Sequence, residues 1–143
     1  EHEGEGFGEL ITDYYKRYKA PIMITETSAV GGEEVREKWL ESSVSVIKNL
    51  RAEGVPVIGY TWFPLFTMID WRYRGSDERV GNFYLELGLY QLNREPNGRR
   101  WLETPLVPMF KNLIRNPKRA VGDLHRSEPP ALAGRLEEMR VER

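Results

Sequence analysis

The chain has 143 residues, of which 40% are hydrophobic, 30% charged and 11% aromatic, and its formal net charge is −1. This balance predicts a folded domain and provides no basic surface for nucleic acid. The sequence contains no cysteine, which excludes disulfides and thiolate metal sites, and the apolar runs are too short to span a bilayer. His2 and His125 lie too far apart in sequence to indicate a metal site. We therefore expect no cofactor, no metal, no nucleic-acid or membrane partner, and a location in the reducing cytoplasm.

The first half of the chain predicts a helix, a strand, a second helix and a second strand. Residues 8–18 carry apolar side chains at three- and four-residue spacing, and residues 22–25 are nearly all apolar, as in a strand of a covered parallel sheet. A helix is predicted from residue 33 to about residue 53, where Gly54 ends it, and a strand follows at 55–62. The expected buried face of this helix consists of Val35, Trp39, Val46, Ile47 and Leu50. Strand, helix and strand in this order form a βαβ unit with parallel strands.

The second half is less regular. Residues 63–74 predict a long aromatic loop, and residues 85–92 alternate weakly, which is typical of a short hairpin or an extra strand. Thr104 is predicted to cap a helix with Pro105 at its first position. Residues 116–143 are polar and contain prolines, so we expect a tail that is helical or disordered.

Glu26 follows the first predicted strand directly, and Trp62 ends the second. Because the carboxyl ends of neighbouring parallel strands meet at one edge of a sheet, we expect the two side chains to lie together there. A carboxylate can attack an anomeric carbon and an indole can carry a sugar ring, so the pair indicates carbohydrate chemistry. Asp70 and Trp71, in the loop that follows, are candidates for binding sugar hydroxyls. Position alone equally allows a structural role for each of these side chains, in a cap, an ion pair, a turn or the core.

Residues 18–26 read Tyr-Lys-Ala-Pro-Ile-Met-Ile-Thr-Glu, an aromatic and a proline before an apolar run that ends in Thr-Glu. Further motifs follow in chain order: Arg36 and Trp39-Leu40, residues 53–60, residues 62–65, Asp70-Trp71 and residues 87–90. In this combination they resemble the family 1 glycoside hydrolases, the β-glucosidase-like (β/α)8 barrels, in which the strand corresponding to residues 18–26 carries the nucleophile. The resemblance covers roughly residues 8–115. Each motif is short, and the specificity lies in their combination.

The resemblance implies a retaining glycosidase in which Glu26 is the nucleophile that forms a glycosyl-enzyme. Trp62 would form the floor of the sugar subsite, and Asp70 and Trp71 would contact the sugar hydroxyls. The spacing from Trp62 to Asp70 is one residue longer than in the family, so Phe63 is the alternative to Trp62. Thr-Ser follows Glu26 where the family has Asn-Gly, which leaves the identity of the sugar open.

The family carries its acid/base glutamate after an asparagine on the fourth barrel strand, and no Asn-Glu pair occurs in this sequence. A (β/α)8 barrel also needs roughly 250 residues. We therefore expect residues 1–115 to be the C-terminal portion of such a barrel, with about its last two βα units. Residues 116–143 would be an appended tail, and this chain alone would be inactive. The alternatives are a non-catalytic barrel that binds carbohydrate or a protein partner, and a small self-contained α/β domain of unrelated function.

Overall fold

A computed structural model describes residues 4–95, 98 and 100–115 of the chain. The first half consists of α1 (Glu5–Tyr18), β1 (Ile22–Thr27), α2 (Glu33–Ala52) and β2 (Val57–Trp62). β1 and β2 pair in parallel, so β1, α2 and β2 form the predicted βαβ unit. This part of the sequence prediction is confirmed. The predicted tail at 116–143 lies outside the described residues.

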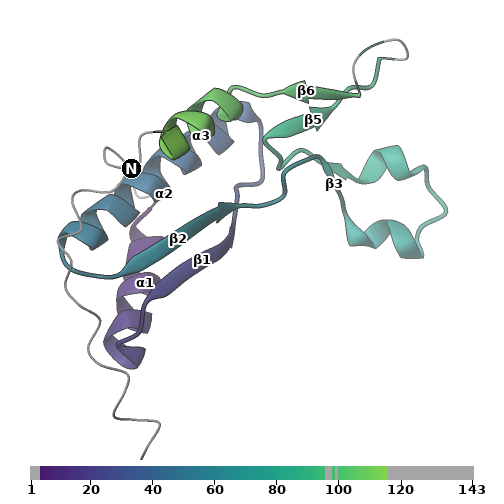
Figure 1. The fold of residues 1–143 in the computed structure, drawn as a ribbon. Helices are drawn as coiled ribbons and strands as arrows, with labels where there is room; N and C mark the ends of the chain where they lie inside the picture. The colour runs from purple at the N-terminus through teal and green to yellow at the C-terminus, as the bar shows by residue number, and fades with distance from the viewer. Residues whose placement is uncertain (1–3, 96–97, 99, 116–143) are drawn as a thin grey trace, which may run out of the picture.

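α1 and α2 pack on one face of the two-stranded sheet formed by β1 and β2 (Figure 1). Ile11 of α1, Ile47 of α2 and Val57 of β2 belong to one buried cluster between these layers. On the other face, Met23 is 55% exposed and Ile58 is 66% exposed. An apolar sheet face open to solvent is a surface on which further structure normally packs.

The connection between α2 and β2 depends on Gly54, as the sequence predicted. This residue has φ +88°, which is in the left-handed region that favours glycine. Its backbone nitrogen donates to the Arg51 carbonyl oxygen at 3.1 Å, and the Val55 nitrogen donates to the Leu50 carbonyl oxygen at 2.9 Å. The last carbonyls of α2 are thereby satisfied, and the chain turns at once into β2.

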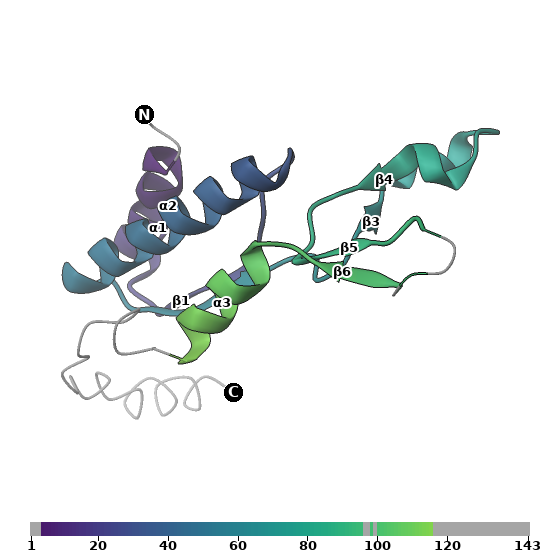
Figure 2. The same cartoon turned by 90° about the horizontal axis from the view of Figure 1, so that it is seen from above.

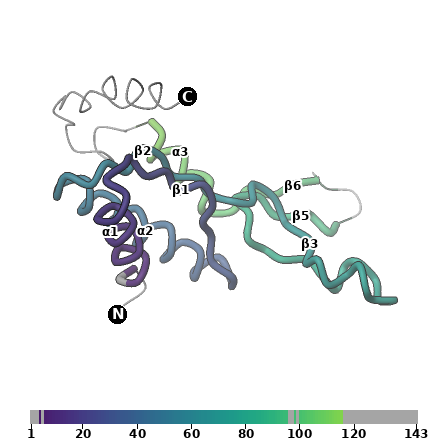
Figure 3. The backbone as a smooth tube through the Cα atoms, turned by 90° about the horizontal axis from the view of Figure 1, so that it is seen from below, coloured from purple at the N-terminus to yellow at the C-terminus, as the bar shows by residue number. Residues whose placement is uncertain are grey.

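The second half forms an arm that extends away from the helices (Figures 1 and 3). Its elements are β3 (Met68–Ile69), the 3-10 helices η1 (Trp71–Gly75) and η2 (Val80–Phe83), β4 (Tyr84–Leu85), β5 (Tyr90–Leu92) and β6 (Trp101–Glu103). β3 pairs with β4, and β5 pairs with β6, both antiparallel. The prediction of one irregular loop at 63–74 is therefore wrong in part. Of the two alternatives predicted for residues 85–92, the hairpin is wrong, because the two ends of this range pair with different partners, whereas a strand, β5, does lie within it.

The last described helix, α3 (Leu106–Arg115), packs against α2, which lies between α1 and α3 (Figure 2). Leu106 and Val107 are almost completely buried there. The predicted capping role of Thr104 is not what the structure shows. The Thr104 hydroxyl donates to the Leu89 carbonyl oxygen at 2.8 Å, so it ties β5 to the start of α3. Leu89 is 15 residues away in sequence, so local capping patterns do not indicate this contact.

Candidate active site

Glu26 lies near the C-terminal end of β1, next to Thr27, which accepts two hydrogen bonds from other elements. The Thr27 hydroxyl accepts a hydrogen bond from Trp39 Nε1 at 2.8 Å, and the Thr27 carbonyl oxygen accepts one from the Phe63 nitrogen at 3.1 Å. The strand register is irregular between Ile24 and Thr27, and Thr25 and Glu26 are both exposed. The Glu26 carboxylate makes no hydrogen bond or ion pair with any side chain that the structure describes. A fixed strand end thus presents an accessible carboxylate.

The structure does not bring the Trp62 indole to the side of Glu26. Trp62 is only 6% exposed and packs in a cluster with Leu40 of α2 and Leu106 of α3. Its Nε1 donates to the Leu87 carbonyl oxygen at 3.0 Å, so the polar atom of the ring is also engaged inside the protein. The reason is register: Trp62 pairs with Thr27, whose side chain contacts α2, and side chains of paired residues lie on the same face. The Trp62 indole is therefore enclosed on the face of the sheet that α2 and α3 cover.

Phe63, the alternative that the sequence left open, is 44% exposed. It directly follows β2, and its backbone nitrogen is bound to the carbonyl of the residue after Glu26. The peptide bond between Phe63 and Pro64 is cis. Phe63 is therefore the aromatic ring that is both accessible and attached to the strand end that carries Glu26.

Asp70 and Trp71 lie in the arm, at the start of η1. Asp70 Oδ1 accepts from the Arg72 nitrogen at 2.9 Å, and its Oδ2 accepts from Arg72 Nε at 2.8 Å and Nη2 at 2.6 Å. These hydrogen bonds and the guanidinium charge hold the pKa of the Asp70 carboxyl below its usual range. Trp71 is 66% exposed, with the Arg74 guanidinium 4.5 Å from its ring centre. Asp70 thus already has a cationic partner that a sugar hydroxyl would have to displace or share.

Replacing Arg72 by glutamine should raise the pKa of Asp70 toward its usual range. In the native protein the lowered pKa gives a stabilising contribution that is present above the ordinary carboxyl pKa and is lost as the pH falls through the lowered value. The variant should lose most of this pH dependence, and an NMR titration of the Asp70 carboxyl carbon measures the change. Arg79→Gln, at an exposed arginine of the same arm, is the control. An unchanged Asp70 titration in Arg72→Gln would contradict the assignment.

Arg36 is part of one of the sequence motifs, but its burial was not predicted from the sequence. The buried positions of α2 are Arg36, Leu40, Ser43, Ile47 and Leu50. Val35, which the apolar pattern placed on the buried face, is 45% exposed. A charged residue and a serine occupy positions of the inward stripe, and no hydropathy pattern identifies them. Only the four- and three-residue spacing of these positions carries the signal.

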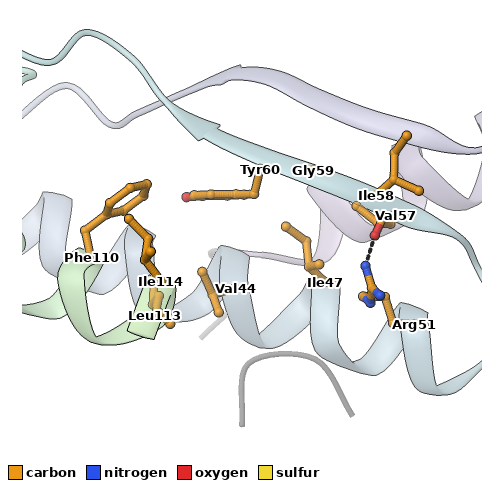
Figure 4. Close-up of a pocket in the computed structure, with 10 residues that line it drawn as sticks. All are labelled: Val44, Ile47, Arg51, Val57, Ile58, Gly59, Tyr60, Phe110, Leu113 and Ile114. Atoms are coloured by element: carbon orange, nitrogen blue, oxygen red, sulfur yellow. Dashed lines mark hydrogen bonds between the residues drawn. The ribbon is translucent and has the colours of Figure 1, made fainter. Parts of the chain in front are cut away.

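One pocket lies away from Glu26, between α2, β2 and α3 (Figure 4). Ile47, Tyr60 and Phe110 are among the residues that line it, and Arg51 Nη1 donates to the Val57 carbonyl oxygen at its edge. Its volume is about 190 Å³, below the range of about 300–1,000 Å³ that is common for small-molecule sites. Burial of the Tyr60 hydroxyl in this region raises its pKa to about 12, with a smaller opposing effect from its hydrogen bond to Ser43. This pocket is therefore not assigned to the sugar site.

Neither a metal cluster nor a membrane-spanning helix is found in the part of the chain that the structure describes. No group of three or more histidine or acidic side chains is placed to hold a metal ion among those residues. None of the described helices combines the length and the apolar character needed to cross a bilayer.

The fold of this chain is similar to part of the fold of several β-glycosidases of known structure. The β-glycosidase of Thermosphaera aggregans matches with a TM-score of 0.62 and 22% sequence identity, over 78% of this chain and 21% of that chain. The β-glucosidase of Thermotoga maritima in complex with glucoimidazole matches with a TM-score of 0.61 and 19% identity, over 78% of this chain and 26% of that one. Aphid myrosinase matches with a TM-score of 0.61 and 19% identity, over 78% and 24%.

The chain has the fold of part of a β-glycosidase. The resemblance drawn from the sequence motifs is thus confirmed at the level of the fold. The chain spans about a fifth to a quarter of the length of these proteins, and its described residues form a small α/β unit and not a closed barrel. No protein-family model and no curated protein matches the sequence.

Proposed function

We propose that these residues form the C-terminal part of a retaining β-glycoside hydrolase, with Glu26 as its nucleophile. The observation that carries the proposal is the exposed carboxylate at the end of a parallel strand, within a fold shared with β-glycosidases. Strand ends of this kind are where such barrels hold their catalytic groups. The exposed apolar side chains of Met23 and Ile58 on the open sheet face support the view that further barrel strands cover it.

In the proposed mechanism, the Glu26 carboxylate attacks the anomeric carbon as the bond to the leaving oxygen breaks. An acid residue, supplied from outside these 143 residues, protonates that oxygen. The same residue then removes a proton from water, which attacks the glycosyl-enzyme and releases the sugar together with the free carboxylate. Two carboxyl groups about 5–5.5 Å apart are expected for this retaining route.

Phe63 is proposed to carry the sugar ring, and the arm is proposed to contribute Asp70 and Trp71. This assignment transfers the platform role from Trp62 to Phe63, because Phe63 is exposed and Trp62 is buried. Exposed aromatic faces bind sugars through their apolar ring faces. Asp70 would accept hydrogen bonds from sugar hydroxyls, in competition with Arg72.

The test is covalent trapping in the whole protein. The fluorine of a dinitrophenyl 2-deoxy-2-fluoro-β-glycoside slows both formation and hydrolysis of the glycosyl-enzyme, and the activated leaving group restores its formation, so the label should accumulate on the peptide that contains Glu26. Mass spectrometry after proteolysis locates it, and an excess of a competing unlabelled glycoside should reduce the labelling. A label on another residue would refute the role of Glu26.

A non-catalytic carbohydrate-binding barrel is the second candidate. It is favoured by the two hydrogen bonds that the Arg72 side chain makes to the Asp70 carboxylate, which leave that acid partly engaged. Such a protein would bind glycosides with no turnover and no covalent label. Calorimetric binding together with a negative trapping experiment identifies this case.

A further inference from the structure

Arg36, on α2, is a buried charge with incomplete hydrogen bonding. It is 0% exposed, and its Nη1 donates to the Gly88 carbonyl oxygen at 2.7 Å. Its Nε and Nη2 find no acceptor among the described residues. Burial lowers the pKa of this guanidinium, and nearby carboxylates, Glu33 first among them, partly oppose the shift. Because an apolar side chain of similar size would avoid the desolvation of a charge, stability alone does not account for an arginine here.

Arg36 contacts Gly88, whose backbone packs directly against the candidate sugar-binding loop, which begins at Phe63. A Cβ at Gly88 would be 2.5 Å from the Phe66 carbonyl carbon and 2.8 Å from the Leu65 oxygen, so the two backbones touch. Two residues further on, the Tyr90 nitrogen donates to the Leu65 carbonyl oxygen at 3.0 Å. Moving Gly88 therefore moves the loop that begins at Phe63.

Three successive carbonyls of this segment are each held by a side chain from a different part of the fold. The Leu87 oxygen accepts from Trp62 of β2, the Gly88 oxygen from Arg36 of α2, and the Leu89 oxygen from Thr104 before α3. Of these three bonds, the one to Gly88 comes from the helix that follows the candidate nucleophile strand.

The same turn of α2 also holds the strand end beside Glu26. Trp39 is three residues after Arg36, so the two side chains lie on neighbouring positions of one helix face. Trp39 Nε1 donates to the Thr27 hydroxyl at 2.8 Å. One helical turn is therefore bonded to both halves of the candidate site: to Thr27 through Trp39, and to Gly88 through Arg36.

We propose that Arg36 is a positioning residue that sets the loop carrying Phe63 and Asp70 relative to Glu26. The inference rests on the proposed function, because that function gives the loop its sugar-binding role. The contacts from which it is argued do not depend on any substrate. A displacement of about 1 Å between reacting groups can reduce a rate by about 100-fold, so a buried charge that fixes this distance has a functional value that an apolar side chain lacks.

Hydrogen exchange of backbone amides in the whole protein tests the proposal without any sugar. Arg36→Met keeps most of the buried volume and removes the bond to Gly88. Exchange of the loop-bound amides of Asp70 and Tyr90 should rise about tenfold, while the sheet amide of Ile22 should change less than about twofold. Arg36→Lys, which keeps a donor and a charge, should restore part of the protection.

Arg79→Met, at an exposed arginine of the arm, is the matched control and should leave all these amides unchanged. An equal rise in the loop and the sheet would show a merely structural role, and no rise in the loop would show no role; either result overturns the proposal. If Arg36→Met fails to fold, Arg36→Gln should raise loop exchange by at least about threefold with the sheet unchanged, and the same two outcomes count against it. Absence of glycoside binding would refute the proposed function and leave this result standing.

Discussion

Replacing Glu26 by alanine should lower kcat/KM for an aryl β-glycoside at least about 1,000-fold in the whole protein, because the covalent step then lacks its nucleophile. The free energy of unfolding should change by less than about 0.5 kcal/mol, since the carboxylate is exposed and is bonded to no described side chain. Azide should restore part of the turnover by attacking the anomeric carbon from the space that the carboxylate leaves. The product would then be a glycosyl azide of inverted configuration, which NMR identifies.

Glu41→Ala provides the matched control for this experiment. Glu41 is an exposed glutamate on α2, away from the end of β1. Its replacement should leave turnover, stability and azide sensitivity unchanged. The nucleophile assignment fails if Glu26→Ala retains normal turnover, or if its melting temperature falls enough to explain the lost activity.

The two neighbouring aromatic residues at the end of β2 should behave in opposite ways. Trp62→Ala should lower the free energy of unfolding by about 3–5 kcal/mol, because it leaves a cavity in the core and frees the Leu87 carbonyl. Phe63→Ala should change it by less than about 1 kcal/mol and weaken glycoside binding about tenfold, because an exposed ring contributes little to the core. Chemical denaturation and calorimetry measure the two effects.

Conservative replacements sharpen this comparison. Trp62→Phe keeps an aromatic ring in the core and loses the Nε1 bond, so it should cost only about 1–2 kcal/mol. Phe63→Leu keeps an apolar side chain and removes the ring, so glycoside binding should fall nearly as far as in Phe63→Ala. Strong loss of binding in Trp62→Phe at unchanged stability would return the platform role to Trp62.

The regular first half of the fold was predictable because its signals are local. Apolar periodicity identified α1 and α2, and the glycine after α2 marked the left-handed turn into β2. The arm was not predictable in the same way. β3 and β4 are two-residue strands separated by two 3-10 helices, so neither carries a periodic pattern long enough to recognise.

In the candidate site too, some residues have a local sequence signal and others do not. Glu26 stands out in the sequence because a carboxylate directly follows an apolar strand. The choice between Trp62 and Phe63 depended on which face of β2 each ring occupies, and a shift of one residue exchanges the faces of a strand. The hydropathy of Arg36 gave no sign of burial, because its contact with Gly88 results from the packing of α2 against a segment 52 residues away.

By itself, the sequence determined the βαβ unit, the carboxylate at the end of its first strand and the resemblance to the β-glucosidase-like barrels. These features rest on short-range patterns of apolar spacing, helix ends and motif order. Tertiary structure alone decided which of the two aromatic rings at the end of β2 is exposed and which turn of α2 is bonded to both Thr27 and Gly88. These contacts depend on strand register and on pairings between distant segments, which no short stretch of sequence determines.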